Sequence, residues 1–330
     1  MIKNKSLQKI KNFLLFSLFA LLFIEVLIGF PVPLEKKTDP FVTQAGRVTE
    51  KESTADQQMT DIHLTESGGN QVKKWELWAK VAEGYEGRGA WELHSVEVHF
   101  YSKSDVSFRV KGDFGTIDTK TKDLVVQGHV LTTSSNQYKF ASDKIIYTAS
   151  QHSLISPSLV QMETPADKNG SSMKVKGGRM RGDIATKFIW MDQGVSAQKL
   201  LQAGKNLEIE SQKVEMSGQD SKMSFSQNVF IQYLGMHMKS PRADFQFSNQ
   251  GGALSNIQML GGVHIQDVEK IATSETVFFD PVENKYIFRG NPKLTQDQDE
   301  LIGDEIVFLN GGKQVKVDKI KAKLEDKPHK

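Results

Sequence analysis

The feature that most constrains the fold of this chain is a period-two alternation of apolar and polar side chains. It dominates from about residue 60 onward. Val96, Val98 and Phe100, for example, alternate with Glu97 and His99. Successive side chains of a β-strand point to opposite faces, so the pattern predicts half-buried strands. Segments rich in Asn, Asp, Lys and Gly separate the runs, as turns between strands do. The alternation therefore predicts an all-β fold.

Two short signatures recur along the chain at spacings of about 29 to 35 residues. In the first, a small or turn-forming residue precedes an alternating run, and we expect it to begin a strand. Its copies are 142–147, 177–180, 211–216, 241–245, 274–279 and 303–308. The second resembles Gly-x-Val and lies at 128–130, 194–195, 228–229, 262–265 and 290–294. A rung of a few strands buries its apolar face only against neighbouring rungs. The repeat therefore predicts a stacked, twisted β-jellyroll of antiparallel strands, either as two modules or as one continuous stack.

Helical signals are weak in the strand-rich part of the chain. The best candidate for a short helical turn is 195–204. We expect strands almost everywhere else from about residue 60 onward.

The first thirty residues have a different character. An apolar run at 13–30 contains Glu25 as its only charge, and four lysines precede it. Eighteen helical residues span about 27 Å, close to the hydrocarbon core of a bilayer. The lysines predict a cytoplasmic N-terminus and an exported remainder. We expect a transmembrane anchor at 1–31 and a tether at 32–55. A cleaved signal peptide is the alternative, but no small-x-small cleavage site follows the run.

Several functional classes are disfavoured by composition and motif content. The chain has no cysteine, which removes disulfides, thiolate metal sites and cysteine nucleophiles. Its net charge of +2 argues against nucleic-acid binding. We expect His94 and His99 to point to opposite faces of a strand, which prevents joint metal binding. The sequence contains no Gly-x-Ser-x-Gly motif. We therefore expect no enzyme activity, no catalytic residues, no cofactor and no metal.

The order of motifs resembles the lipopolysaccharide-transport periplasmic family that contains LptC, LptA and the N-terminal domain of LptD. The anchor, followed by 75–79, 82–84, 96–101, 112–118 and 124–130, is similar to LptC over about residues 60–165. The repeated rungs up to residue 309 look like the LptA/OstA-type module. The resemblance places an LptC-like jellyroll at 56–165 and an LptA/OstA-like jellyroll at 166–330. The chain is longer than a single-module relative, so the second module either meets a separate LptA or partly replaces it.

The resemblance implies a membrane-anchored component of the lipopolysaccharide transport bridge. Such a component lies in the inner membrane with a single pass, and its bulk is periplasmic. Its implied partners are lipopolysaccharide, the inner-membrane ABC transporter complex that extracts it, and an LptA-like or LptD-like jellyroll docked by its end strands. The alternative is an anchored β-solenoid scaffold or adhesin-like interaction protein without a lipid groove.

A carrier of this kind needs an apolar groove, because each buried methylene contributes about 0.8 kcal/mol. The larger apolar residues of the inward faces are the candidates for its lining, although the same residues could pack a closed core. They are Trp75, Leu77, Val98, Phe100, Phe114, Tyr138, Phe140, Tyr147, Val229, Ile231, Met238, Phe245, Met259, Ile265, Phe279, Phe288 and Phe308.

Overall fold

The structure is a computed structural model, and its strands belong to a compact unit that spans Thr54–Lys330. It describes residues 55–69, 72–85, 87–201, 204–217, 221–248, 252–268, 270–297, 299–310, 314–319 and 321–323. The predicted anchor at 1–31 and all but the last residue of the predicted tether at 32–55 lie outside these ranges. Among the residues that are described, no helix has the length and hydropathy needed to cross a membrane.

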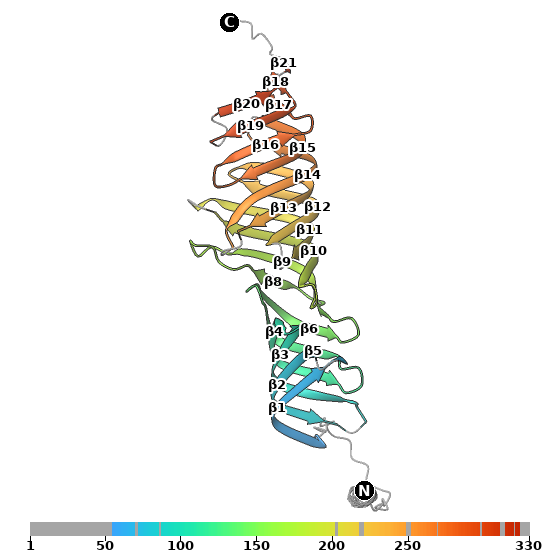
Figure 1. Cartoon of the computed structure of the whole chain (residues 1–330). Helices are drawn as coiled ribbons and strands as arrows, with labels where there is room; N and C mark the ends of the chain where they lie inside the picture. The colour runs from blue at the N-terminus through green and yellow to red at the C-terminus, as the bar shows by residue number, and fades with distance from the viewer. Residues whose placement is uncertain are drawn as a thin grey trace, which may run out of the picture. The chain divides into compact units, whose positions relative to one another are not determined.

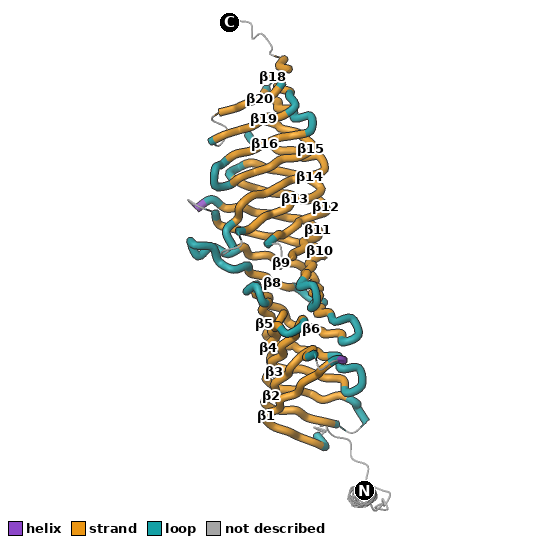
Figure 2. Tube along the Cα trace, viewed as in Figure 1, coloured by secondary structure: helices purple, strands orange, loops and turns teal. Residues whose placement is uncertain are grey.

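The described part of the chain is built from twenty-one β-strands, which confirms the all-β prediction (Figure 2). The strands of the first half are β1 Gln57–Ser67, β2 Lys73–Gly84, β3 Ala90–Ser102, β4 Asp105–Asp118, β5 Leu124–Ser134, β6 Lys139–Thr148, β7 Ser153–Ser156, β8 Val160–Glu163, β9 Met173–Asp183 and β10 Phe188–Leu200. Those of the second half are β11 Asn206–Ser217, β12 Lys222–Tyr233, β13 Met236–Phe247, β14 Leu254–Gln266, β15 Lys270–Asp280, β16 Lys285–Arg289, β17 Lys293–Gln296, β18 Asp299–Ile302, β19 Glu305–Leu309, β20 Gln314–Asp318 and β21 Lys321–Lys323.

All described pairings belong to one antiparallel sheet in which long strands pair with the strands before and after them in the chain (Figure 1). Two rungs differ, because two short strands replace one long strand. β7 and β8 both lie between β6 and β9. β16 and β17 both pair with β15. On its other side β16 pairs with β19, which pairs with β20, and β17 pairs with β18, which pairs with β21. The hydrogen-bonded ladder therefore runs without a break from β1 to the last strands.

Each long strand from β2 to β15 is interrupted near its middle, and apolar side chains are buried on both sides of the interruption. In β11, Leu207 and Ile209 are buried before it, and Val214 and Met216 after it. The register with β12 shifts at the same place. Successive interruptions fold the sheet into two arms. The first arm contains β8 and β17, the second arm contains β7 and β16, and the apolar core lies between them.

In eight of these strands the interruption is of one of two kinds, and these two kinds account for most copies of the two repeated signatures. In β5, β10, β12 and β14, two consecutive residues have positive φ, at 128–129, 193–194, 227–228 and 261–262. In β6, β11, β13 and β15, a serine hydroxyl donates to the carbonyl two residues later, at Ser142, Ser211, Ser240 and Ser274. The first signature was expected to begin a strand, but in these four strands it marks the bend in the middle.

The prediction of a helical turn at 195–204 was wrong for the first part of that segment. Residues up to Leu200 belong to β10, where Val195, Ala197 and Lys199 are buried and alternate with exposed Ser196 and Gln198. A small side chain and a lysine at inward positions hide the alternation in the sequence. The tertiary environment therefore decides the conformation here.

Candidate functional site

The space between the two arms is lined with apolar side chains, and most of the predicted lining residues lie there. Buried residues from this set are Trp75, Leu77, Val98, Phe100, Tyr138, Phe140, Tyr147, Val229, Ile231, Met238, Phe245, Met259, Ile265, Phe279 and Phe288. Phe308 is half-buried and packs against the same core. Their burial places them in the interior, and which of them would contact a ligand stays a prediction.

Phe114 is the exception, because its side chain is 48% exposed on the outer face. The interruption in β4 lies between Lys111 and Phe114, so inward positions change from even to odd numbers there. Phe114 instead packs edge-on against His94, its cross-strand neighbour in β3, with the ring centroids 5.4 Å apart. The sequence alternation alone could not reveal this change of phase.

The same kind of interruption corrects the expectation for His94 and His99. In β3 the buried residues are Leu93 before the interruption and Val96, Val98 and Phe100 after it. Both histidines therefore lie on the outer face rather than on opposite faces. No group of His, Asp and Glu within the described ranges is arranged to hold a metal ion.

Aromatic side chains meet across the interior from opposite arms. Tyr233 lies at the first-arm end of β12, and Phe279 lies at the second-arm end of β15, with ring centroids 5.3 Å apart. Phe100 of the first arm and Tyr147 of the second arm are 4.7 Å apart. At these levels the two arms are in direct contact through side chains, so a ligand enters only where the rings move apart.

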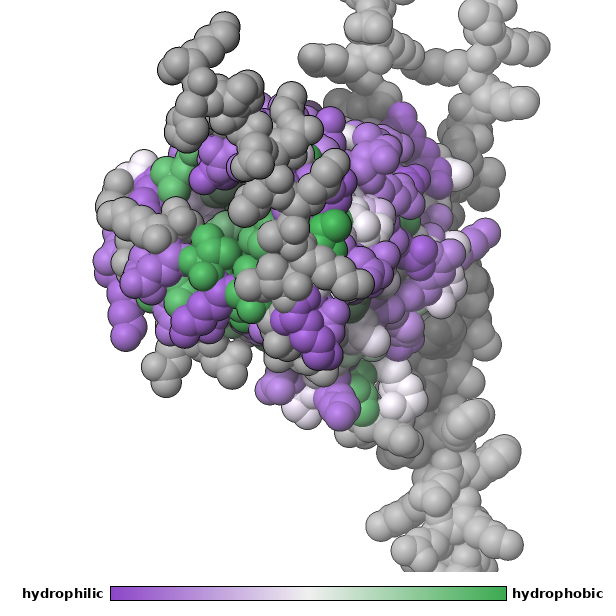
Figure 3. All heavy atoms as spheres, turned by 90° about the horizontal axis from the view of Figure 1, so that it is seen from above, coloured by the Kyte–Doolittle hydropathy of each residue, from purple (hydrophilic) through white to green (hydrophobic). Residues whose placement is uncertain are grey.

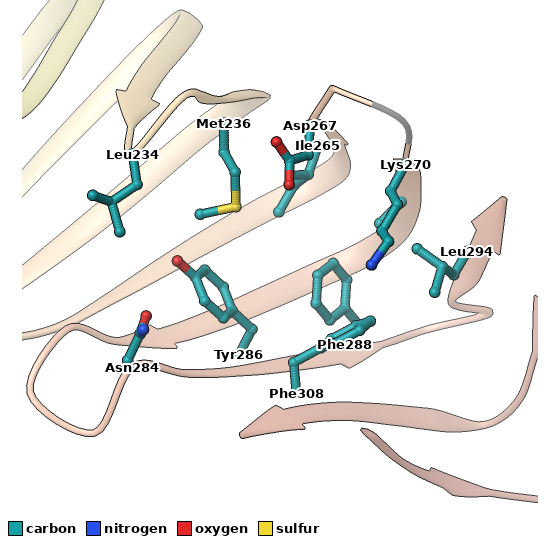
Figure 4. A pocket seen from close by; sticks show the side chains of 11 residues that line it. Leu234, Met236, Ile265, Asp267, Lys270, Asn284, Tyr286, Phe288, Leu294 and Phe308 are labelled. Atoms are coloured by element: carbon teal, nitrogen blue, oxygen red, sulfur yellow. The ribbon is translucent and has the colours of Figure 1, made fainter. Parts of the chain in front are cut away.

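A cavity of about 280 Å³ lies between the arms near the C-terminal strands (Figure 4). Asp267, in the turn between β14 and β15, and Lys270, the first residue of β15, lie on the first-arm side, and Asn284 lies on the second-arm side. The other lining residues are mostly apolar: Leu234, Met236, Ile265, Ala272, Tyr286, Phe288, Leu294 and Phe308. An apolar cavity with a few polar groups at its edge is the usual form of a lipid or small-molecule site.

A second cavity, of about 240 Å³, lies between the arms near the N-terminal strands. It contains two predicted lining residues, Trp75 from the first arm and Tyr147 from the second. Its remaining lining residues are Glu66, Lys74, Thr121, Lys122, Ala149 and Ser150. Because these are mainly polar, the C-terminal cavity is the better candidate for apolar ligands.

Turns bridge the two arms at intermediate levels. The hydroxyl of Ser102, in the first arm, donates to the carbonyl of Ala185 in the turn between β9 and β10, at 3.1 Å. Higher in the stack, the 164–172 loop between β8 and β9 reaches the turn between β13 and β14. A β-carbon at Gly252 would lie only 2.1 Å from the carbonyl oxygen of Pro165. These bridges separate the two cavities along the side where the arms are open.

The 164–172 loop is fastened to the first arm by a buried lysine. Lys199 is 1% exposed, and its ammonium donates to a carboxylate oxygen of Asp167 at 3.1 Å and to the Ser171 carbonyl at 3.0 Å. Burial alone would raise the pKa of the Asp167 carboxyl group. Hydrogen bonds from the Ser171 and Asn169 amides and from Lys199 outweigh burial and lower this pKa. The Asp167 carboxylate therefore stays ionised at neutral pH, and its contact with Lys199 holds the loop.

Sequence reasoning missed most of the residues that line the C-terminal cavity. Leu234, Met236, Lys270 and Asn284 lie at or beside turns, where alternation gives no inward assignment. Tyr286 could have been found, because it alternates with the predicted residue Phe288 across Ile287. The turn residues line the cavity only because the two arms face each other, which the alternation does not predict.

The fold and its interior define a class of protein: an antiparallel β-sheet folded into two arms around an apolar core, whose described end strands pair on one side only. Two family models match the chain in series. The model "Lipopolysaccharide-assembly, LptC-related" matches residues 21–200, and "LptA/(LptD N-terminal domain) LPS transport protein" matches residues 208–314. The first match covers more than half of the 330 residues, so the chain belongs to the LptC-related family of lipopolysaccharide assembly.

Among solved structures, the chain is similar to LptH from Pseudomonas aeruginosa, described as the LptA-homologous periplasmic component of the conserved lipopolysaccharide transport device. The likeness has a TM-score of 0.33 and 11% identity, and it covers 36% of this chain and 95% of the LptH chain. A comparison with curated proteins found no match. The two family models make the chain a periplasmic component of lipopolysaccharide transport, in a family of transport proteins rather than enzymes.

Proposed function

We propose that this chain is a membrane-anchored part of the lipopolysaccharide transport bridge that holds lipid acyl chains between its two arms. The observation that carries the proposal is the apolar interior, which opens into a cavity of about 280 Å³ beside the C-terminal strands. Acyl chains cannot cross an aqueous compartment unshielded, because burial of each methylene is worth about 0.8 kcal/mol. An apolar slot open along one side shields the chains and leaves the sugars in water.

The end strands, which pair on one side only, support docking to other components of the bridge. β1 pairs only with β2, and its inward residues Met59 and Leu64 are exposed. At the other end, Figure 3 shows apolar side chains gathered in the middle of the surface, with hydrophilic ones around them. A strand from another jellyroll can extend such an edge by main-chain hydrogen bonds and cover the apolar end. We propose that one end receives lipid from the ABC transporter complex and the other passes it to an LptA-like or LptD-like jellyroll.

The apolar run at 13–30 supports the proposed anchor and a location in the inner membrane. If the run is replaced by a cleavable signal sequence, we expect the exported chain to move from the membrane fraction to the soluble periplasmic fraction. Cell fractionation and immunoblotting measure the distribution. A replaced chain that stays with the membrane through carbonate washing would contradict anchoring by this segment.

Photocrosslinking in cells tests the interior as the lipid path. A photoreactive amino acid at Phe140 or Phe279 faces inward, and one at the adjacent Ala141 or Phe278 faces outward. We expect adducts with lipopolysaccharide from the inward positions and few from the outward ones. Adducts from outward positions alone would refute the interior path. Absence of adducts at all four positions, in a chain that still assembles with a partner, would favour the anchored scaffold.

A further inference from the structure

Two polar atoms at one end of the C-terminal cavity have no partner. The hydroxyl of Tyr286 and the side-chain oxygen of Asn284 are buried, and neither forms a hydrogen bond with any described residue. Both residues line the cavity, and Figure 4 shows them side by side at the end where Leu234 and Met236 also lie. A buried polar group without a partner destabilises a fold, so an unpaired pair at a cavity needs an explanation.

The chemistry of these two atoms is complementary to a hydroxyl group. Burial raises the pKa of Tyr286, and the nearby Tyr233 hydroxyl and Asp267 raise it further, so Tyr286 stays a protonated donor. The oxygen of Asn284 accepts hydrogen bonds only. A ligand hydroxyl can accept from Tyr286 and donate to Asn284 at the same time, whereas an ester carbonyl satisfies only the tyrosine.

The rest of the cavity specifies what carries that hydroxyl. Ile265, Phe288, Leu294 and Phe308 offer only apolar surface. A flexible thioether, Met236, lies on the same side as the Tyr286 hydroxyl in Figure 4. Methionine adapts readily to the shape of a ligand, so it can move aside as a chain enters. Lys270, on the first-arm side of the cavity, can pair with an acidic group outside the apolar part.

We propose that this cavity selects hydroxylated acyl chains, with the hydroxyl held between Tyr286 and Asn284. The proposal rests on the proposed function, because it assumes that acyl chains enter between the arms. It adds a basis for selection, since a chain without the hydroxyl leaves both buried polar atoms unpaired. A site that hydrogen-bonds a ligand hydroxyl discriminates against the ligand that lacks it.

A competition experiment on the full-length chain in amphipol tests the assignment. The probe is a fluorescent fatty acid, displaced either by a straight-chain fatty acid or by the β-hydroxy acid of the same length. We expect the hydroxy acid to bind about three- to tenfold more tightly, the gain of one or two net hydrogen bonds. In Tyr286→Phe, which keeps the ring stacked on Phe279, we expect a smaller preference for the hydroxy acid, because only Asn284 can still bind the hydroxyl.

Thr132→Val is the matched control. It also removes one buried, unpartnered hydroxyl, but Thr132 lies in β5 and does not line the cavity. We expect it to preserve the preference for the hydroxy acid. Equal binding of both acids to the unmodified chain, or a preference that Tyr286→Phe leaves undiminished, would overturn the hydroxyl assignment alone. If neither acid displaces the probe from any variant, the binding of acyl chains between the arms fails as well.

Discussion

At the residue scale, the buried side chain of Lys199 holds the 164–172 loop against the first arm. Lys199 occupies an inward position of β10 among apolar neighbours, where an ammonium group is tolerated only because Asp167 and the Ser171 carbonyl surround it. Removing one partner of a buried ion pair is costly, because the other charge stays buried. The loop and the first arm should therefore respond together to mutation.

Lys199→Met keeps the length of the side chain but leaves Asp167 without its cation. We expect the free energy of unfolding to fall by about 3 kcal/mol at neutral pH, measured by urea denaturation. The pKa of Asp167 is lowered in the folded chain, so its contribution is present above the unfolded value of 3.8 and is lost as the pH falls through the folded pKa. The difference between the two chains should therefore narrow below about pH 4. Lys176→Met, at an exposed position, is the control, and an equal loss there would contradict the prediction.

Gly252 tests the bridge between the 164–172 loop and the second arm. Gly252→Ala introduces a β-carbon 2.1 Å from the Pro165 carbonyl oxygen, in a residue whose φ is +63°. At Gly204, φ is +71° but no atom lies within 4 Å of the same position. We expect Gly252→Ala to cost about 1 to 2 kcal/mol more than Gly204→Ala in urea denaturation. Equal losses in the free energy of unfolding would mean that only the backbone conformation matters and that the 164–172 loop shifts away without cost.

Residue-level prediction from the sequence succeeded where alternation continued without interruption, and failed where the phase changed. Phe140 and Phe279 were correctly assigned to the inward face. Phe114 was not, because its phase depends on an interruption in β4 that has no apolar signature of its own. Asn284 and Lys270 lie in or beside turns, so their place at the cavity depends on how the arms meet.

At the scale of elements, the bends in the strands alternate between two chemistries along the stack. Strands with two positive-φ residues are followed by strands in which a serine hydroxyl bonds to the main chain. Both arrangements occur where the regular hydrogen-bonded ladder stops. The serine hydroxyl bonds to a backbone carbonyl group, and the two positive-φ residues let the backbone bend. The repeat in the sequence thus predicted the stack correctly. Most copies of the first signature marked bends, whereas the copy at 303–308 does begin a strand, because turn-forming residues serve both purposes.

The serine bends should contribute measurably to stability. In Ser240→Ala and Ser274→Ala the carbonyl groups of Arg242 and Thr276 lose a donor at 2.9 and 3.0 Å, respectively. We expect each substitution to lower the free energy of unfolding by about 1 kcal/mol. Ser196→Ala, on the exposed face of β10, should leave it almost unchanged. Thermal and urea denaturation provide the measurement, and no difference among the three variants would remove the structural role of the serine bends.

At the scale of the whole described unit, an unbroken ladder joins the regions matched by the two family models. β10 lies in the first region and β11 in the second, and they pair from Phe188 with Ser217 to Leu200 with Asn206, so the backbone connection between the two regions passes through both arms. The sequence left open whether the rungs form two modules or one continuous stack. The pairing is continuous, and it leaves β1, β20 and β21 as the strands that pair on one side only.

Proline substitutions in β20 test docking at its free edge. Val315 and Lys316 are adjacent in a strand that pairs only with β19, so one amide points to β19 and the other points away. We expect one of Val315→Pro and Lys316→Pro to block assembly with a partner jellyroll at little cost in stability. The other should lose about 1 kcal/mol through a lost ladder bond. Co-purification and denaturation are the readouts, and normal assembly by both variants would exclude this edge as a docking site.

The contact of Tyr233 with Phe279 across the interior has a consequence for the carrier when it is unloaded. These rings fill part of the interior, and under the proposed function a hydrocarbon tail would displace them. A carrier with a permanently open channel would, when empty, expose a long apolar surface to water and would tend to aggregate. If acyl chains bind there as proposed, each tail replaces contacts between the rings with contacts to hydrocarbon, so binding and release would exchange similar apolar surroundings.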